Sequence, residues 1–164
     1  MLLSREFWET ASAVVTVVGL PFAILVFIWE QRKERQMNQE ELYQRLSDEY
    51  TKFMKLVLDN ADLRLLRPGG QSFQLTEEQQ ERQLALFSIL VAIFERAYLL
   101  VYEDTMEPQT RRMWQSWEDF MRDWCKRSDF RAALPELLNG EDEQFAAHIS
   151  KIAQEVDPSF KRLA

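Results

Sequence analysis

The sequence holds 164 residues, and its 20 basic and 27 acidic side chains give a formal net charge of −7 at pH 7. Nucleic acid rewards clustered cations, so this acidic chain predicts no nucleic-acid partner. Its four glycines cannot supply a glycine-rich phosphate loop, and one histidine with one cysteine excludes a metal site built from His and Cys. We therefore expect no cofactor.

The first strong feature along the chain is an uncharged run of 19 residues from Ala11 to Trp29. As a helix it would cover about 28 Å, close to the ~30 Å hydrocarbon core of a bilayer. Trp8 and Trp29 bracket the run, and indole rings favour the two membrane interfaces. The pattern predicts a transmembrane helix over residues 11–29 in contact with the lipid bilayer, after a short tail over residues 1–10.

Two other interpretations of this run are weaker. A cleaved signal peptide needs a basic start and a small-residue cleavage site, but here Arg5 is balanced by Glu6 and Glu9, and no A-x-A pattern follows. A buried helix of a soluble domain is the other alternative. Pro21 is compatible with a span, because neighbouring groups re-satisfy the freed backbone in membrane helices.

The charges that flank the run predict its orientation. Arg32, Lys33 and Arg35 follow it closely, whereas Arg5 alone precedes it. By the positive-inside rule, the N-terminus lies outside and the long C-terminal part lies in the cytoplasm.

A juxtamembrane helix or stalk is predicted over residues 30–60. Its apolar residues recur at alternating spacings of three and four, which is typical of one helix face. They are Tyr43, Leu46, Tyr50, Phe53 and Val57. This stripe faces either a second copy of the chain or the helices of its own domain, and the second is favoured because those helices need a surface to pack on.

The only strong punctuation in the chain is Arg67-Pro68-Gly69-Gly70, which predicts a loop over residues 61–75. Thr76 and Gln79 then form a capping box that opens a cytoplasmic helical bundle over residues 76–157. A tail over residues 158–164 follows it.

The apolar run from Leu84 to Phe94 leaves two interpretations open. A second membrane span over residues 84–102 would place Glu95 and Arg96 in mid-bilayer, at a cost of several kcal/mol. The uncharged run is also only 11 residues long. A central helix that is buried on most sides is therefore favoured.

Three more helices are expected after this run. Pro108 suits the first turn of a tryptophan-rich helix. Its tryptophans favour core packing over a bilayer surface, because acidic residues interleave with the cations beside them. Ser128 is predicted to cap a short helix that stops at Asn139-Gly140, and the last helix runs from Glu141 to Val156. The fold class is all-α: one N-terminal transmembrane helix continues into a bundle of about four to five helices.

Few residues carry recognisable chemistry. His148 lies on an amphipathic helix as an exposed or edge-of-core side chain, and Cys125 is a small hydrophobe on a helix. Glu95 interrupts the most apolar helix, which predicts a buried or half-buried ion pair with an arginine of another helix, or a role in a pore or pocket. No catalytic or metal-binding constellation appears, so the chain is not expected to be an enzyme.

Four small residues lie on one side of the predicted span. They are Ser12, Thr16, Gly19 and Ala23, at spacings of four, three and four. Gly19 and Ala23 form a small-x-x-x-small pair, which lets helix backbones approach closely. A single span needs a partner from another chain, so the seam predicts a homo-oligomer, unless the pattern arose by chance.

The chain resembles a broad group of small bacterial single-pass membrane proteins of unknown function with a helical cytoplasmic domain. The resemblance rests on the segments WEQRKERQ, SDEYTKFMKLVLDNADLRLL and WEDFMRDWCKRSDFR. It implies location in the bacterial inner membrane and adds nothing about a reaction.

Two functions fit these features. The first is a non-enzymatic, membrane-anchored interaction or scaffold protein that associates with itself or with a cytoplasmic protein partner. The alternative is an oligomeric membrane pore or membrane-disrupting effector, for example in anti-phage defence, with Ser12 and Thr16 on its seam.

Overall fold

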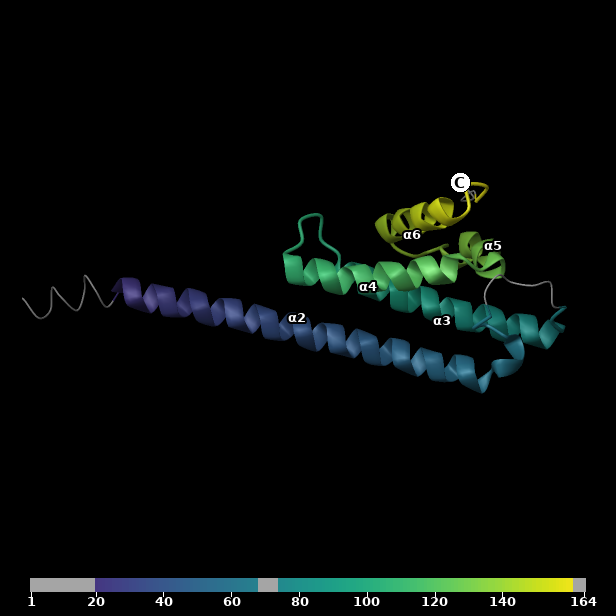
Figure 1. The fold of residues 1–164 in the computed structure, drawn as a ribbon, viewed down its shortest axis with the longest axis horizontal. Coiled ribbons are helices and arrows are strands. Elements are labelled where there is room, and N and C mark those ends of the chain that lie inside the picture. The colour runs from purple at the N-terminus through teal and green to yellow at the C-terminus, as the bar shows by residue number, and fades with distance from the viewer. Residues whose placement is uncertain (1–19, 68–73, 161–164) are drawn as a thin grey trace, which may run out of the picture. The chain divides into compact units, whose positions relative to one another are not determined.

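A computed structural model describes residues 20–67 and 74–160 of the chain. Within these ranges every regular element is a helix and no strand occurs, which confirms the predicted all-α class. The elements are α2 (Leu20–Asp59), the 3₁₀ turn η2 (Ala61–Leu63), α3 (Glu77–Val101), α4 (Pro108–Cys125), α5 (Ser128–Leu137) and α6 (Glu143–Val156) (Figure 1).

The chain divides into two compact units, Met1–Glu41 and Leu42–Ala164, which are described separately. In the first unit, residues 20–41 belong to α2. Nine of the 19 residues of the predicted span, 11–19, lie outside the described residues. The prediction of an N-terminal membrane helix therefore stays a prediction.

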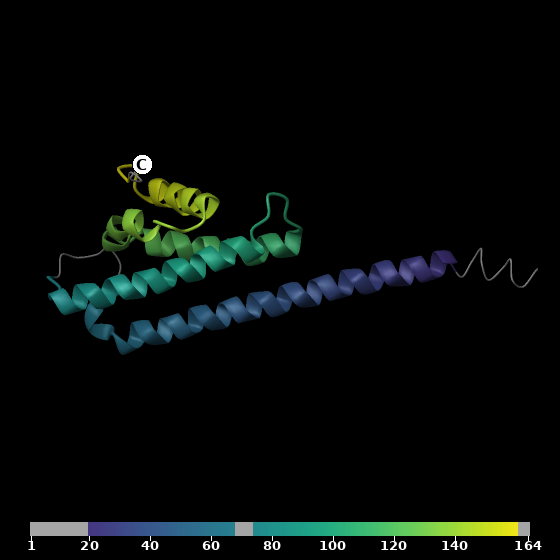
Figure 2. The same cartoon turned by 180° about the vertical axis from the view of Figure 1, so that it is seen from behind.

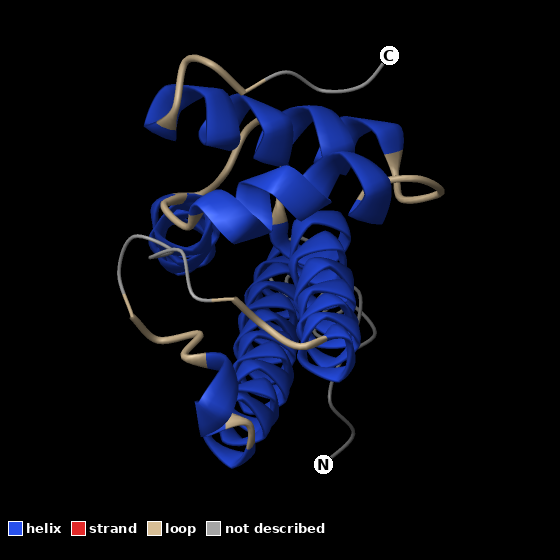
Figure 3. Cartoon of the chain, turned by 90° about the vertical axis from the view of Figure 1, so that its right-hand side faces the viewer, coloured by secondary structure: helices blue, strands red, loops and turns tan. Residues whose placement is uncertain are grey.

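The second unit begins with the C-terminal part of α2, which lies beside α3 (Figures 2 and 3). Leu46, Phe53 and Val57 of α2 are at most 2% exposed. The apolar stripe of this helix thus faces the helices of its own domain, as the sequence favoured. The bundle accordingly includes residues from Leu42 onward, whereas the sequence placed its start at residue 76.

The central helix of the second unit is α3, which packs on α4, α5 and α6. It begins at the predicted capping box: the Thr76 hydroxyl accepts from the Gln79 N–H, and the Gln79 side chain accepts from the Thr76 N–H. Among the described residues it is the one helix long and apolar enough to cross a membrane, and half of its apolar stretch is buried inside the protein. Phe22–Gln31 of α2 is a shorter apolar stretch.

Aromatic side chains fill the space between α2, α3 and α4. Trp114, Trp117 and Trp124 of α4 are at most 6% exposed, so these tryptophans pack in the core as predicted. The Trp124 indole meets the rings of Phe53 and Phe87 edge-on, with ring centroids 5.7 and 6.2 Å away. Such edge-to-face contacts add to the free energy gained from burial alone.

The last two helices begin one or two residues from the predicted positions. Ser128 is the first residue of α5 and makes no capping bond; Arg127 occupies the N-cap position. α6 begins at Glu143, because the carboxylate of Asp142 accepts from the N–H groups of Gln144 and Phe145 and so caps the helix. Gly140 has a φ of +94°, a conformation that glycine adopts without strain, and it turns the chain between the two helices.

Deleting the Phe94 ring should destabilise the second unit strongly. Phe94 on α3 is fully buried, and we expect Phe94→Ala to lower the free energy of unfolding by about 3–5 kcal/mol through lost burial and a cavity. Leu58→Ala is the matched control, since Leu58 is 60% exposed and should change stability by less than about 0.5 kcal/mol. Urea unfolding followed by circular dichroism measures both, and equal losses would contradict this core assignment.

Candidate functional site

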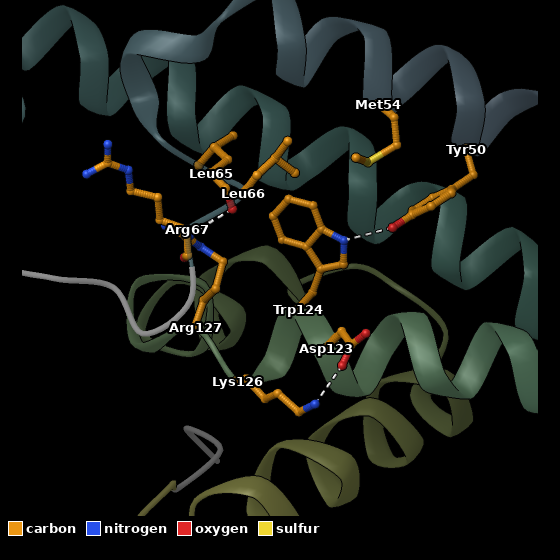
Figure 4. Close-up of a pocket in the computed structure, with 9 residues that line it drawn as sticks. All are labelled: Tyr50, Met54, Leu65, Leu66, Arg67, Asp123, Trp124, Lys126 and Arg127. Atoms are coloured by element: carbon orange, nitrogen blue, oxygen red, sulfur yellow. Dashed lines mark hydrogen bonds and ion pairs between the residues drawn. The ribbon is translucent and has the colours of Figure 1, made fainter.

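A cavity of about 430 Å³ lies in the second unit, where the end of α4 meets α2 and the turn after η2 (Figure 4). Small-molecule sites commonly have volumes of this order. The lining comes from three segments far apart in the sequence: Tyr50 and Met54 of α2, Leu65, Leu66 and Arg67 of the turn, and Asp123, Trp124, Lys126 and Arg127 at the end of α4.

The wall of the cavity is mainly apolar and is built around Trp124. Its indole N–H donates to the Tyr50 hydroxyl at 3.1 Å, which satisfies the polar atom of an otherwise buried ring (Figure 4). Burial of Tyr50 raises the pKa of its phenol. The Tyr50 ring also stacks on Phe120, with ring centroids 4.5 Å apart. These contacts fix the wall in one conformation, which leaves little freedom to lose when an apolar group binds.

Arg127 closes one side of the cavity and holds the turn in place. Its guanidinium donates to the carbonyl oxygens of Leu65 at 2.8 Å and Arg67 at 2.9 Å, and it pairs with the Asp129 carboxylate at 2.5 Å. The residue is only 7% exposed. A buried cation needs both charge and hydrogen-bond partners, and Arg127 has both.

The mouth of the cavity carries exposed charge. The Lys126 ammonium pairs with Asp123 at 2.7 Å, and Arg67 lies exposed at the end of the turn. The nine lining residues include no histidine, cysteine or serine. The arrangement can hold an apolar group beside positive charge.

Glu95 on α3 has a different partner from the arginine that the sequence predicted. Its carboxylate accepts from the backbone N–H of Asp142 at 2.7 Å. It also lies beside Glu141. A hydrogen bond to Glu95, helped by burial and by the negative charge of Glu95, raises the pKa of Glu141 to about 7. The Glu95 carboxylate thus connects α3 to the loop before α6.

His148 on α6 lies against three aromatic rings. The ring centroids of Tyr98, Tyr102 and Trp114 are 5.3–5.5 Å from that of the imidazole. Its Nε2 atom is buried without a hydrogen-bond partner, and burial lowers the pKa of the imidazole. His148 is therefore a half-buried, edge-of-core residue, as the sequence suggested. Cys125 is likewise buried, and burial raises the pKa of its thiol to about 12.

The remaining residues singled out from the sequence belong to the first unit. Trp8, Ser12, Thr16 and Gly19 lie outside the described residues, so the predicted seam and one membrane-interface tryptophan are untested. Ala23 and Trp29 are exposed residues of α2. The juxtamembrane cations Arg32, Lys33 and Arg35 also belong to α2. Within the described part of the chain, no group of three or more His, Cys, Asp or Glu residues could hold a metal ion.

Sequence reasoning missed the cavity itself. Two signals pointed to its parts: the Arg67-Pro68-Gly69-Gly70 punctuation, and the cluster of charge and tryptophan from Asp123 to Arg127. Neither signal revealed that the two segments meet, because the contact of Arg127 with the Leu65 carbonyl joins residues 62 positions apart.

Comparisons with known proteins give no relative for this chain. No family model, no curated protein and no solved structure matches it.

Removing the Arg127 guanidinium should loosen the turn that borders the cavity. Arg127→Ala takes the donor from the Leu65 and Arg67 carbonyls and removes the cation beside Asp129, whose carboxylate keeps the Gln83 amide and the Phe130 N–H as donors. We expect a loss of about 2–4 kcal/mol in unfolding free energy. Arg127→Lys should restore only part of it, since an ammonium lacks the planar fork. The neighbouring Lys126→Ala is the control and should change stability by less than about 0.5 kcal/mol, because its ion pair is exposed. Chemical denaturation measures all three, and a neutral Arg127→Ala would contradict the role assigned to this side chain.

The Glu95–Glu141 pair should make stability depend on pH. The pKa of Glu141 is about 7 in the folded protein and near 4.5 when unfolded, so its stabilising contribution is complete below about pH 4.5 and is lost as pH rises through 7. Glu141→Gln keeps the side chain neutral at every pH, and its melting temperature should rise relative to the parent between pH 5 and pH 8. The exposed Glu143→Gln is the control. If the melting temperatures of Glu141→Gln and the parent change in parallel across this range, the pKa of Glu141 is not raised.

Proposed function

We propose that this chain is a non-enzymatic, membrane-anchored helical interaction protein that self-associates. The observation that carries the proposal is the exposure of large apolar side chains in the first unit. Phe22, Leu25, Phe27 and Trp29 are 60–66% exposed, and Ile24, Val26 and Ile28 are 38–51% exposed. An apolar surface of this density is costly in water and favourable in a bilayer.

The sequence before and after this segment supports the same location. The uncharged run extends back to Ala11, which gives a helix the length that a bilayer requires. Arg32, Lys33 and Arg35 follow it and favour a cytoplasmic position for the second unit. The N-terminus would then lie outside the cytoplasmic membrane.

The second unit supports a role in interaction. It has a packed aromatic core of its own, and it also exposes large apolar residues on α2, on the turn and on α3. These are Leu56, Leu58, Leu66, Leu99 and Leu100, which are 41–60% exposed. Exposed apolar residues that gather on a folded unit are typical of surfaces where proteins meet. A second copy of the chain, through the seam of small residues or another surface, and a cytoplasmic protein are the partners we propose.

A charge in the middle of the apolar segment should release the protein from the membrane. Ile24 is 51% exposed and lies inside the predicted span. An arginine there costs about 2.5–3.5 kcal/mol on insertion scales, so we expect Ile24→Arg to move a substantial part of the protein to the soluble or aggregated fraction. Met37→Arg is the matched control, because Met37 is 60% exposed on the same helix but lies beyond the segment.

The measurement is the share of full-length protein that stays with membranes after alkaline carbonate washing. A parent protein that washes off, or an Ile24→Arg variant that stays as firmly bound as Met37→Arg, would refute the anchor. Light scattering of the protein in nanodiscs then tests self-association, which requires a mass above that of one copy.

A further inference from the structure

One side of α3 is apolar and exposed although the other side forms the centre of the core. We call it the outer face of α3; it comprises Leu84, Ala85, Ser88, Ile89 and Ala92. Their spacing of three to four places them on one side of the helix. Leu84 and Ile89 are 38% and 41% exposed. The Ser88 hydroxyl donates to the Leu84 carbonyl at 3.0 Å, so its polar hydrogen is satisfied within the helix.

Neighbouring α2 widens this apolar surface. The ion pairs Arg96–Glu49 and Arg82–Asp62 join the two antiparallel segments at separated levels. Interpolation between them places Leu56 near the level of Ile89, and each of these side chains is 41% exposed. Figure 2 shows α3 and the C-terminal part of α2 side by side. The outer face of α3 therefore continues onto α2.

Lipid fits this face poorly, although α3 is apolar enough to cross a membrane. The opposite side of the helix is committed to the core, where Phe87 and Phe94 are at most 1% exposed. The exposed face is bounded by Glu81 and Arg96, which are 15 residues or about 22 Å apart, less than the ~30 Å of a hydrocarbon core. A bilayer around this face would desolvate at least one of these charges.

The charges at the two ends of the outer face are complementary to each other. Consider two antiparallel α3 helices related by a twofold axis between Ser88 and Ile89. Each residue then lies opposite the residue at the same distance on the other side of the axis, so the two residue numbers add up to 177. Glu81 then faces Arg96 of the second copy, and Ala85 faces Ala92 of the second copy. A parallel pair would instead place like charges together at both ends. Arg96 already binds Glu49, but its side chain is 52% exposed and keeps donors available.

We propose that the outer face of α3 binds a second copy of this chain, with the two α3 helices antiparallel about a twofold axis between Ser88 and Ile89. Ala85 and Ala92 let the backbones approach closely in the middle, while Leu84, Ile89 and Leu56 are buried around them. The pairing belongs to the second unit alone and sets no condition on the orientation of residues 20–41. It rests on the self-association in the proposed function and names the surface that carries it.

One helix face is smaller than the roughly 800 Å² per partner that a stable interface buries. The pair is therefore weak in dilute solution and is detected best by a chemical trap. Cysteine cross-linking suits this chain, because Cys125 is fully buried and gives little background.

The experiment uses two full-length variants, Ala85→Cys and Ala92→Cys, which carry different tags and are oxidised alone and mixed. In the antiparallel pair, position 85 lies level with position 92 of the other copy, so thiols from Ala85→Cys and Ala92→Cys can meet. Two copies of Ala85→Cys instead hold their thiols about 10 Å apart along the axis, beyond disulfide reach. We expect at least about fivefold more cross-linked dimer from the mixture than from either variant alone. A mixture of Ala85→Cys with Ala147→Cys, an exposed alanine of α6, is the matched control. Adding Ile89→Lys to both variants should lower the yield at least about fivefold.

Three results would overturn the inference. If Ala85→Cys alone forms cross-linked dimer as fast as its mixture with Ala92→Cys does, the two helices are parallel. A mixture that yields no more dimer than the Ala147→Cys control shows that no second copy covers this face. In that case the reaction of Ala85→Cys with a water-soluble maleimide tells what covers the face instead. Protection from the maleimide without dimer formation indicates lipid. A mass above one copy without 85–92 cross-links would leave the proposed self-association intact and place it on another surface, whereas a mass of one copy would refute both.

Discussion

The second unit depends on one constraint: α3 is apolar on nearly all sides, and most of it must be kept from water. Leu90, Phe94 and Ala97 are fully buried because α4, α5 and α6 pack on one side of the helix, and α2 covers a further strip. Each covering helix is amphipathic and meets α3 with its own apolar face. The free energy of burying these side chains is the main driving force for this arrangement. These helices leave the outer face of α3 exposed.

Polar contacts at the edges fix how the helices are aligned around α3. Arg96 with Glu49 and Arg82 with Asp62 set the level of α2 against α3, and Glu95 joins α3 to the loop before α6. Arg127 does the same for the turn after η2. Apolar packing is not directional, whereas hydrogen bonds and ion pairs have preferred geometry. The edge contacts therefore select one alignment among several with a similar core.

Each unit has an exposed apolar surface, and the two surfaces differ in the role that we propose for them. The segment around Phe22–Trp29 is apolar on every side, which suits lipid, whereas the outer face of α3 is a strip bounded by opposite charges, which suits another protein surface. The cavity at the end of α4 is a third feature, small and rigid, with positive charge at its mouth. These features are the basis of the proposed role in anchoring and interaction. Charge pairing, which lipid cannot supply, is what distinguishes the second surface from the first.

The sequence by itself determined the helical class, the capping box at Thr76, the proline start of α4 and the core positions of the tryptophans. These features depend on a few neighbouring residues, since caps, breakers and periodicity act within one or two turns. The starts of α5 and α6 predicted from the sequence differ from the observed ones by one or two residues. Ser128 and Asp142 are both residue types that favour the N-cap, but only Asp142 accepts hydrogen bonds from backbone N–H groups of its helix. Only the tertiary structure decided the partner of Glu95, the cavity beside Trp124 and which side of α3 stays exposed. Each of these depends on residues that lie 47 or more positions apart, and their meeting is set by how whole helices pack.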